Sequence, residues 1–194
     1  MQEDSVKGGN NMAKRVSVFL ADGFEEIEGL TVVDLLRRAG VEVATVSTTG
    51  DLTIHGAHKI DVQADKMFNE VDYNEEDMVV LPGGMPGTLN LGAHAGVKEV
   101  LEQFYAAKKY IGAICAAPSV LGKYGILDGR KATSYPGFEA ELKGAEYLTE
   151  PVVVSDFVIT SRGLGTAIDF ALALITVLMG TEKADEISRS IIYR

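Results

Sequence analysis

Short apolar runs alternate along the chain with longer segments of helical periodicity. Arg15 to Ala21 is an apolar run with β-branched residues that stops at Asp22-Gly23, which predicts a buried strand. Apolar residues then recur at helical spacing from Glu25 to Ala39, and Gly40 is typical of a helix end. The same alternation predicts further strands at 41–47, 77–81, 110–114, 131–134 and 152–160, and helices at 97–108, 118–124 and 166–179. A small hairpin is predicted over 52–62 and a short helix over 65–69.

This order of elements predicts an α/β fold with a mostly parallel sheet. Each predicted strand is a nearly continuous apolar run, which is typical of parallel strands that helices cover on both faces. Ligand sites in such sheets lie at the carboxyl ends of the strands. Three loops fall at that edge, at 22–28, 82–87 and 115–118. Because no repeat or linker interrupts the pattern, we expect one domain over residues 14–194 after a polar, flexible extension at 1–13.

Composition and charge narrow the range of partners. The 194 residues are 46% hydrophobic and carry a formal net charge of -10, which argues against nucleic acid and anionic membranes as partners. The longest apolar helix, near 170–179, is too short to span a bilayer, and the start of the chain lacks the apolar core of a signal peptide. A single cysteine cannot form an internal disulfide, so we expect a cytoplasmic protein.

That cysteine, Cys115, stands where a strand is predicted to turn directly into a helix. Small residues flank it on both sides in Ala113-Ile114-Cys115-Ala116-Ala117, as a sharp nucleophile elbow requires. A helix N-terminus would favour the thiolate and lower the pKa of the thiol. The backbone N–H of Ala116 would point at an oxyanion formed beside the sulfur. The alternative is a buried cysteine that acts as a small hydrophobe, which a cysteine within an apolar strand would suit better.

Two other strand ends supply candidate partners for this thiol. Pro82-Gly83-Gly84 follows a buried strand, and the N–H of Gly84 is the natural second oxyanion donor, although an ordinary strand–helix turn would have similar glycines. Glu28 shares a helix face with Val32 and Leu36, the stripe expected to face the sheet. A carboxyl group there should have a raised pKa and could move a proton.

The remaining chemistry-bearing residues point to structural or assembly roles. Ile27 and Leu30 lie off the sheet-facing stripe, and such an apolar patch predicts a homodimer through this first helix. The three histidines, His55, His58 and His94, are scattered without ligand spacing, so we expect no metal. The first loop is acidic and lacks the dinucleotide fingerprint, so we expect no cofactor either.

Five motifs together carry a resemblance to a known family. The chain resembles the ThiJ/PfpI superfamily, and within it the branch of the parkinsonism-associated DJ protein and its protein-deglycase relatives. The motifs occur in order and at the family's spacing, and they are LADGFEEIE at 20–28, DLLRRAG at 34–40, VLPGG at 80–84, AICAAP at 113–118 and TSRGLGT at 160–166.

The resemblance implies a flavodoxin-like α/β/α sandwich, like that of the class I glutamine amidotransferases, and a homodimer. It makes Cys115 the oxidation-prone nucleophile, Glu28 its protonated partner, and Gly84 and Ala116 the backbone oxyanion donors, with Gly83 and Tyr135 as accessory positions. Ala116 stands where the protease-like branch has a histidine, so peptidase activity is not expected. Tyr135 stands where some deglycase-branch members have a histidine, which leaves proton transfer mainly to Glu28. Since no histidine follows Cys115, amidotransferase chemistry is excluded.

Two functions fit these residues. The first is cofactor-independent handling of methylglyoxal-type 2-oxoaldehydes or glycated protein groups by Cys115, as in glyoxalases and deglycases. The second is a redox sensor or redox-regulated chaperone in which Cys115 is oxidised to sulfinate beside protonated Glu28. A catalytically inactive scaffold is the third alternative.

Overall fold

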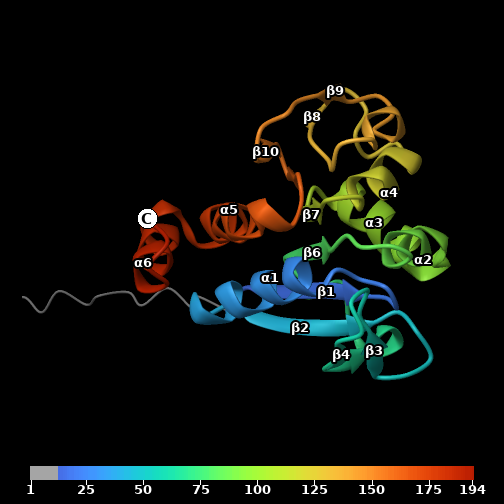
Figure 1. The fold of residues 1–194 in the computed structure, drawn as a ribbon, viewed down its shortest axis with the longest axis horizontal. Helices are drawn as coiled ribbons and strands as arrows, with labels where there is room; N and C mark the ends of the chain where they lie inside the picture. The colour runs from blue at the N-terminus through green and yellow to red at the C-terminus, as the bar shows by residue number, and fades with distance from the viewer. Residues whose placement is uncertain (1–12) are drawn as a thin grey trace, which may run out of the picture.

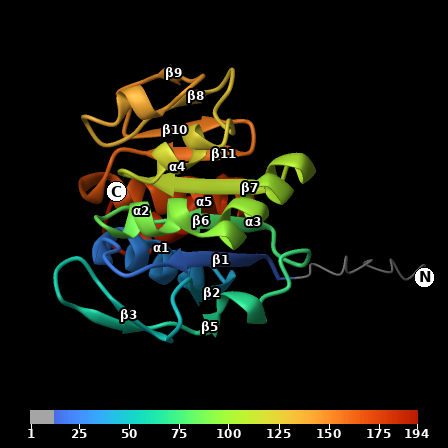
Figure 2. The same ribbon diagram turned by 90° about the vertical axis from the view of Figure 1, so that its right-hand side faces the viewer.

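A seven-stranded sheet forms the middle of the protein in the computed structural model, which describes residues 13–194. Its strand order is β10-β11-β7-β6-β1-β2-β5, and only the β10–β11 pair is antiparallel. Figure 2 shows this order from top to bottom. The strands are β1 (Arg15–Leu20), β2 (Glu42–Ser47), β5 (Lys66–Met67), β6 (Met78–Leu81), β7 (Tyr110–Ile114), β10 (Val152–Ser155) and β11 (Val158–Ser161). The mostly parallel sheet predicted from the apolar runs is therefore confirmed.

Helices cover both faces of this sheet. One face carries α1 (Glu26–Arg38), α5 (Ala167–Met179) and α6 (Thr181–Ser190), and the other carries α2 (Gly87–Ala93), α3 (Ala95–Ala107) and α4 (Pro118–Lys123). Successive strand residues alternate between the two cores, so Val18 packs with the α1 side and Phe19 with the α3 side (Figure 1). The fold is thus a flavodoxin-like three-layer α/β/α sandwich, as expected.

Smaller elements decorate the carboxyl edge and the flank of the sheet. The predicted hairpin is present as β3 (Thr53–His55) and β4 (Asp61–Gln63), which pair antiparallel. Beyond β7, β8 (Lys131–Ala132) pairs with β9 (Glu146–Tyr147). Three single 3₁₀ turns are η1 (Phe68–Glu70), η2 (Glu139–Glu141) and η3 (Leu164–Thr166).

Several predicted boundaries were wrong for local reasons. The helix expected at 65–69 is the edge strand β5 followed by η1. The strand expected over 152–160 is a hairpin, because the chain reverses at Asp156, whose φ is 55°. The predicted strand at 131–134 ends at Ala132. Helix α6 was missed because polar residues dominate its sequence, TEKADEISRS.

The extension predicted at 1–13 lies outside the described residues except for Ala13, and the one-domain division stays a prediction. Across residues 13–194, every helix is too short or too polar to cross a membrane.

Candidate active site

Cys115 occupies the sharp turn that the small flanking residues predicted. It follows the last residue of β7, and its φ is 66°, in the left-handed region that residues with a side chain rarely adopt. Its N–H donates to the carbonyl of Ser161 at 3.0 Å, and its carbonyl accepts from the N–H of Tyr135 at 2.8 Å. The end of β11 and the loop after β8 therefore hold this strained backbone from both sides.

The helix that follows the turn begins at Pro118, as predicted, but Cys115 does not lie at its N-terminus. Residues 115–117 form a turn in which the N–H of Ala117 donates to the carbonyl of Ile114 at 3.0 Å. Helix α4 starts only at Pro118 and is six residues long. The thiol therefore does not lie within the first turn of a helix, and the expected effect of a helix dipole on its pKa loses its basis.

Glu28 reaches the same place from the first turn of α1. It is 1% exposed, as its position on the sheet-facing stripe predicted. Its N–H donates to the carboxylate of the N-cap residue Glu25 at 2.7 Å, and its Oε2 accepts from the N–H of Gly83 at 3.0 Å. Its carboxyl group also lies beside Cys115, which lowers the pKa of Glu28 in part. Burial, reinforced by the charge of Glu25, raises the pKa of Glu28 to about 7.

The thiol pKa differs from the sequence-based prediction. Burial and then the charge and hydrogen bond of the Glu28 carboxylate raise the pKa of Cys115 to about 12, whereas we expected a lowered value. Two of these three causes come from ionised Glu28 and vanish when Glu28 is protonated. The two residues therefore titrate as one unit: the first proton leaves near neutral pH, and the pair then holds the remaining proton and one negative charge.

Backbone N–H groups surround this pair. Those of Ala116 and Gly84 lower the pKa of the Cys115 thiol, so both predicted donors act on the sulfur. Gly83 serves Glu28 instead, and it must be glycine, because a Cβ there would lie 2.6 Å from both the Cys115 Cβ and the Glu28 Oε2. The end of β6 thus supplies one donor to each member of the pair.

The accessory residue Tyr135 contributes through its backbone. Its side chain is 52% exposed at the rim, beside Gly163, while its N–H holds the Cys115 carbonyl. The segment after β11 also borders the site, because a Cβ on Gly163 would come within 3.8 Å of Glu28 Oε1. Within this segment Thr166 bonds Gly163 and Ser161 rather than the start of α5.

Each histidine has a hydrogen-bond partner of its own. His94 caps α3, with its Nδ1 accepting from the N–H of Val97 at 3.1 Å, which is a structural role. His55 and His58 are exposed, and each is hydrogen-bonded to a carboxylate. The ligand atoms of His58, Glu25 and Glu26 lie within 4.8 Å of one another, a grouping that sequence spacing did not reveal. The hydrogen bond from His58 to Glu26 accounts for this proximity.

Comparison with known proteins identifies the family of this chain. The sequence model of the DJ-1/PfpI family matches residues 14–177, which are most of the chain. The chain belongs to the DJ-1/PfpI family. This membership confirms the resemblance drawn from the five motifs.

Full-length relatives of this DJ-1/PfpI family member share about a third of its residues. Protein dj-1beta of Drosophila melanogaster is 37% identical over 183 residues, which cover 93% of this chain and 98% of the relative. The glutathione-independent glyoxalase DJR-1.2 of Caenorhabditis elegans is 34% identical over 164 residues, covering 84% and 87%. The structure of oxidized DJ-1 of Toxoplasma gondii superposes with a TM-score of 0.90 at 38% identity, over 93% of this chain and 99% of the other.

Proposed function

We propose that the protein converts 2-oxoaldehydes such as methylglyoxal, free or as early adducts on protein groups, into 2-hydroxy acids without a cofactor. The observation that carries this proposal is the buried, electrostatically coupled pair of Cys115 and Glu28, with the N–H groups of Ala116 and Gly84 acting on the sulfur. A relative of the same family is named a glutathione-independent glyoxalase, which agrees with it.

The first step joins the thiol to the aldehyde. As the sulfur of Cys115 forms a bond to the aldehyde carbon, the thiol proton passes to the Glu28 carboxylate, so a free thiolate is not needed beforehand. The N–H groups of Ala116 and Gly84 hold the alkoxide that develops on oxygen. Glu28 then returns the proton to that oxygen and leaves a neutral hemithioacetal. A carboxyl pKa of about 7 lets Glu28 accept and donate with nearly equal ease at neutral pH.

The second step moves hydrogen between carbons. Glu28 takes the proton from the former aldehyde carbon, giving an enediolate, and returns it to the neighbouring carbon, while the hydroxyl proton passes between the two oxygens. The first carbon is thereby oxidised to a thioester and the second is reduced to an alcohol. Water cleaves the thioester, which releases the 2-hydroxy acid and restores the thiol. The balance is one aldehyde plus one water to one acid, and from an adduct the protein amine or thiol leaves as the sulfur of Cys115 takes its place.

Incubation of the purified, chelated protein with methylglyoxal tests this proposal. We expect lactate from the wild type and none above background from Cys115→Ala, with Glu28→Gln reduced to a similar degree. Equal lactate production by the wild type and Cys115→Ala would refute it.

A redox-sensing or redox-regulated chaperone role is the second candidate, and the same donors favour it. Two peroxide molecules would oxidise the Cys115 sulfur, first to sulfenic and then to sulfinic acid. Each peroxide transfers one oxygen atom to the sulfur and leaves as water. Neutral Glu28 and the two backbone N–H groups could then hold the sulfinate oxygens. A relative was captured in a structure described as oxidized. Mass spectrometry after mild peroxide discriminates, because this role fails if Cys115 stays a thiol while methionines oxidise.

The assembly and the compartment complete the proposal. Ile27 and Leu30 are 50% and 36% exposed on the outer side of α1, and we propose that a second copy covers them in a homodimer. A lone cysteine that must stay reduced suits the cytoplasm.

A further inference from the structure

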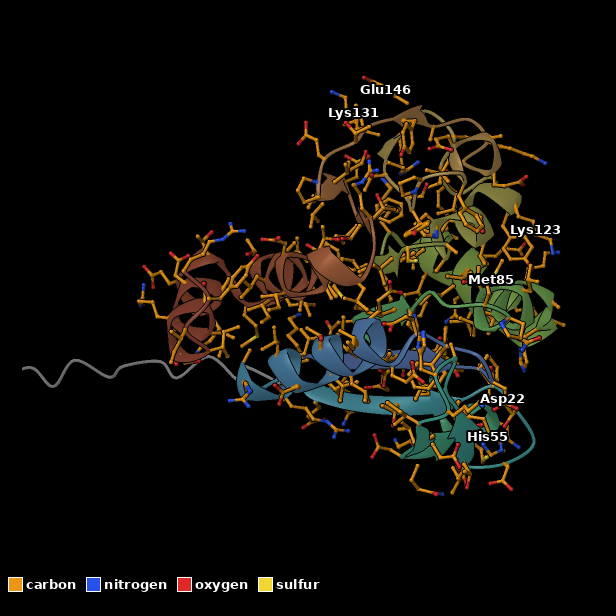
Figure 3. The ribbon with its side chains drawn as sticks, in the orientation of Figure 1. Asp22, His55, Met85, Lys123, Lys131 and Glu146 are labelled. Carbon is orange, nitrogen blue, oxygen red and sulfur yellow. The ribbon has the colours of Figure 1, made fainter. Side chains whose placement is uncertain are left out.

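The β3–β4 hairpin is fastened to the loop that leads from β1 into α1. Figure 3 shows Asp22 of this loop beside His55 of the hairpin. The five connecting hydrogen bonds run from Gly23 N–H to His55 O (2.7 Å), His55 N–H to Asp22 Oδ1 (2.9 Å), Ala57 N–H to Phe24 O (2.9 Å), His58 N–H to Glu26 Oε1 (2.7 Å) and between His58 Nδ1 and Glu26 Oε2 (2.8 Å). Both oxygens of Glu26 are thus engaged by one residue.

Glu26 is unusual for an acidic residue because it is nearly buried. It is 3% exposed, while the imidazole of His58 that covers it is mostly exposed. Gly56 packs directly on its carboxylate, and a side chain at Gly56 would collide with it. Glu26 is also the first residue of α1, two positions before Glu28. A contact that holds Glu26 in place therefore also holds the first turn of α1, on which Glu28 lies.

The other side of the same loop faces the β6 end. The N–H of Glu25 donates to the Gly83 carbonyl at 2.9 Å, and the N–H of Gly87 donates to the Gly23 carbonyl at 3.1 Å. The loop thus lies between the hairpin and the segment whose N–H groups reach Glu28 and Cys115. If the hairpin detached, water would gain access to the start of α1, and both contacts of Glu28 would loosen.

We propose that Glu26 and His58 are positioning residues, whose hydrogen bonds clamp the hairpin onto the start of α1 and keep Glu28 sealed against Cys115 and Gly83. The inference deepens the proposed function, on whose Cys115–Glu28 site it rests, but it concerns the geometry of that site rather than turnover. The charged group nearest the clamp is Glu25, whose Oε1 lies 3.9 Å from His58 Nδ1 and whose charge also acts on Glu28.

The titration of Glu28 tests the clamp directly. We would follow the Glu28 carboxyl carbon by NMR in the full chain, assigned by its loss in Glu28→Gln. In His58→Ala we expect the pKa of Glu28 to fall by ~0.5 unit or more, because water would relieve the burial that raises it. Removal of the imidazolium charge alone would shift the pKa upward, so a fall is diagnostic of loosening. His58→Asn, which can still donate to Glu26, should restore most of the wild-type value.

His55→Ala is the matched control. His55 also donates from an exposed imidazole to a carboxylate at 2.8 Å, but its partner Asp61 belongs to the hairpin itself. We expect no change in the titration of Glu28 there. An unchanged or raised pKa of Glu28 in His58→Ala would overturn the proposal, as would an equal fall in His55→Ala. Because the readout needs no turnover, a wild type that makes no lactate would refute the proposed function alone.

Discussion

Glu28, on the first turn of α1, and Cys115, at the end of β7, lie side by side against Gly83, and each acts on the pKa of the other. Neither residue is catalytically useful by itself at neutral pH. A buried thiol has a raised pKa, and a carboxyl group of ordinary pKa is too weak a base. Coupled, they hold one proton and one negative charge between them near pH 7, which is the state that adds to an aldehyde.

Alkylation of Cys115 should therefore report the titration of the pair. In the wild type we expect the rate of reaction with iodoacetamide to rise through an inflection near pH 7, the pKa of Glu28. In Glu28→Gln the proton acceptor is gone and the thiol must ionise in a buried position, so the inflection should move to higher pH. Rates from pH 5 to 10, with the adduct located by mass spectrometry, measure both. An inflection that stays in place in Glu28→Gln would show that Glu28 does not couple to the sulfur.

The raised pKa of Glu28 also predicts how stability depends on pH. The unfolded carboxyl loses its proton near 4.5, whereas the folded one keeps it up to about 7. Between these values the folded state binds more protons, so the free energy of unfolding should fall as pH rises, by on the order of 3 kcal/mol at most. Glu28→Gln removes this term and should flatten the profile. Urea unfolding at pH 5 and pH 8 tests it, and a wild-type profile no steeper than that of Glu28→Gln would contradict the shift.

Much of the site was readable from sequence because its causes are local. The burial of Glu28 follows from helical spacing with Val32 and Leu36, and the turn at Cys115 follows from the alanines around it. Parallel strands then bring their carboxyl ends together, which places Gly83 and Gly84 beside the sulfur.

What could not be predicted depends on contacts between distant segments. The thiol pKa was predicted with the wrong sign, because the nearest charge comes from another element and because a turn at 115–117 separates the thiol from α4. The bond between His58 and Glu26 joins residues 32 positions apart, and the histidine spacing carried no sign of it. Helix α6 was not predicted because its polar sequence resembles that of a surface segment.

Replacement of Gly83 should act directly on the Cys115–Glu28 pair, because both side chains pack against this glycine. In Gly83→Ala the added methyl carbon would meet both Cys115 and Glu28 at 2.6 Å, so these side chains must separate. We expect a loss of about 1–3 kcal/mol in stability, as overpacking usually costs, together with loss of lactate production. Gly50→Ala is the control, because a Cβ there has nothing within 4 Å. Thermal unfolding and the methylglyoxal assay compare the two, and a fully active Gly83→Ala would show that the close approach is unnecessary.

The exposed apolar residues of α1 make the proposed dimer testable without reference to activity. Ile27 and Leu30 lie in the first turns of the helix that carries Glu28, and an exposed isoleucine there has no role in the core. If a second copy covers them, Ile27→Lys with Leu30→Lys would bury two unpaired charges from each copy at a two-fold contact and shift the protein to monomers. Ile60, 54% exposed just before β4, provides the matched control, and Ile60→Lys should leave the assembly unchanged. Light scattering after size exclusion gives the masses against the chain mass of 20.8 kDa. If the wild type is a monomer, the proposed dimer is wrong. If Ile60→Lys lowers the measured mass equally, the contact lies elsewhere.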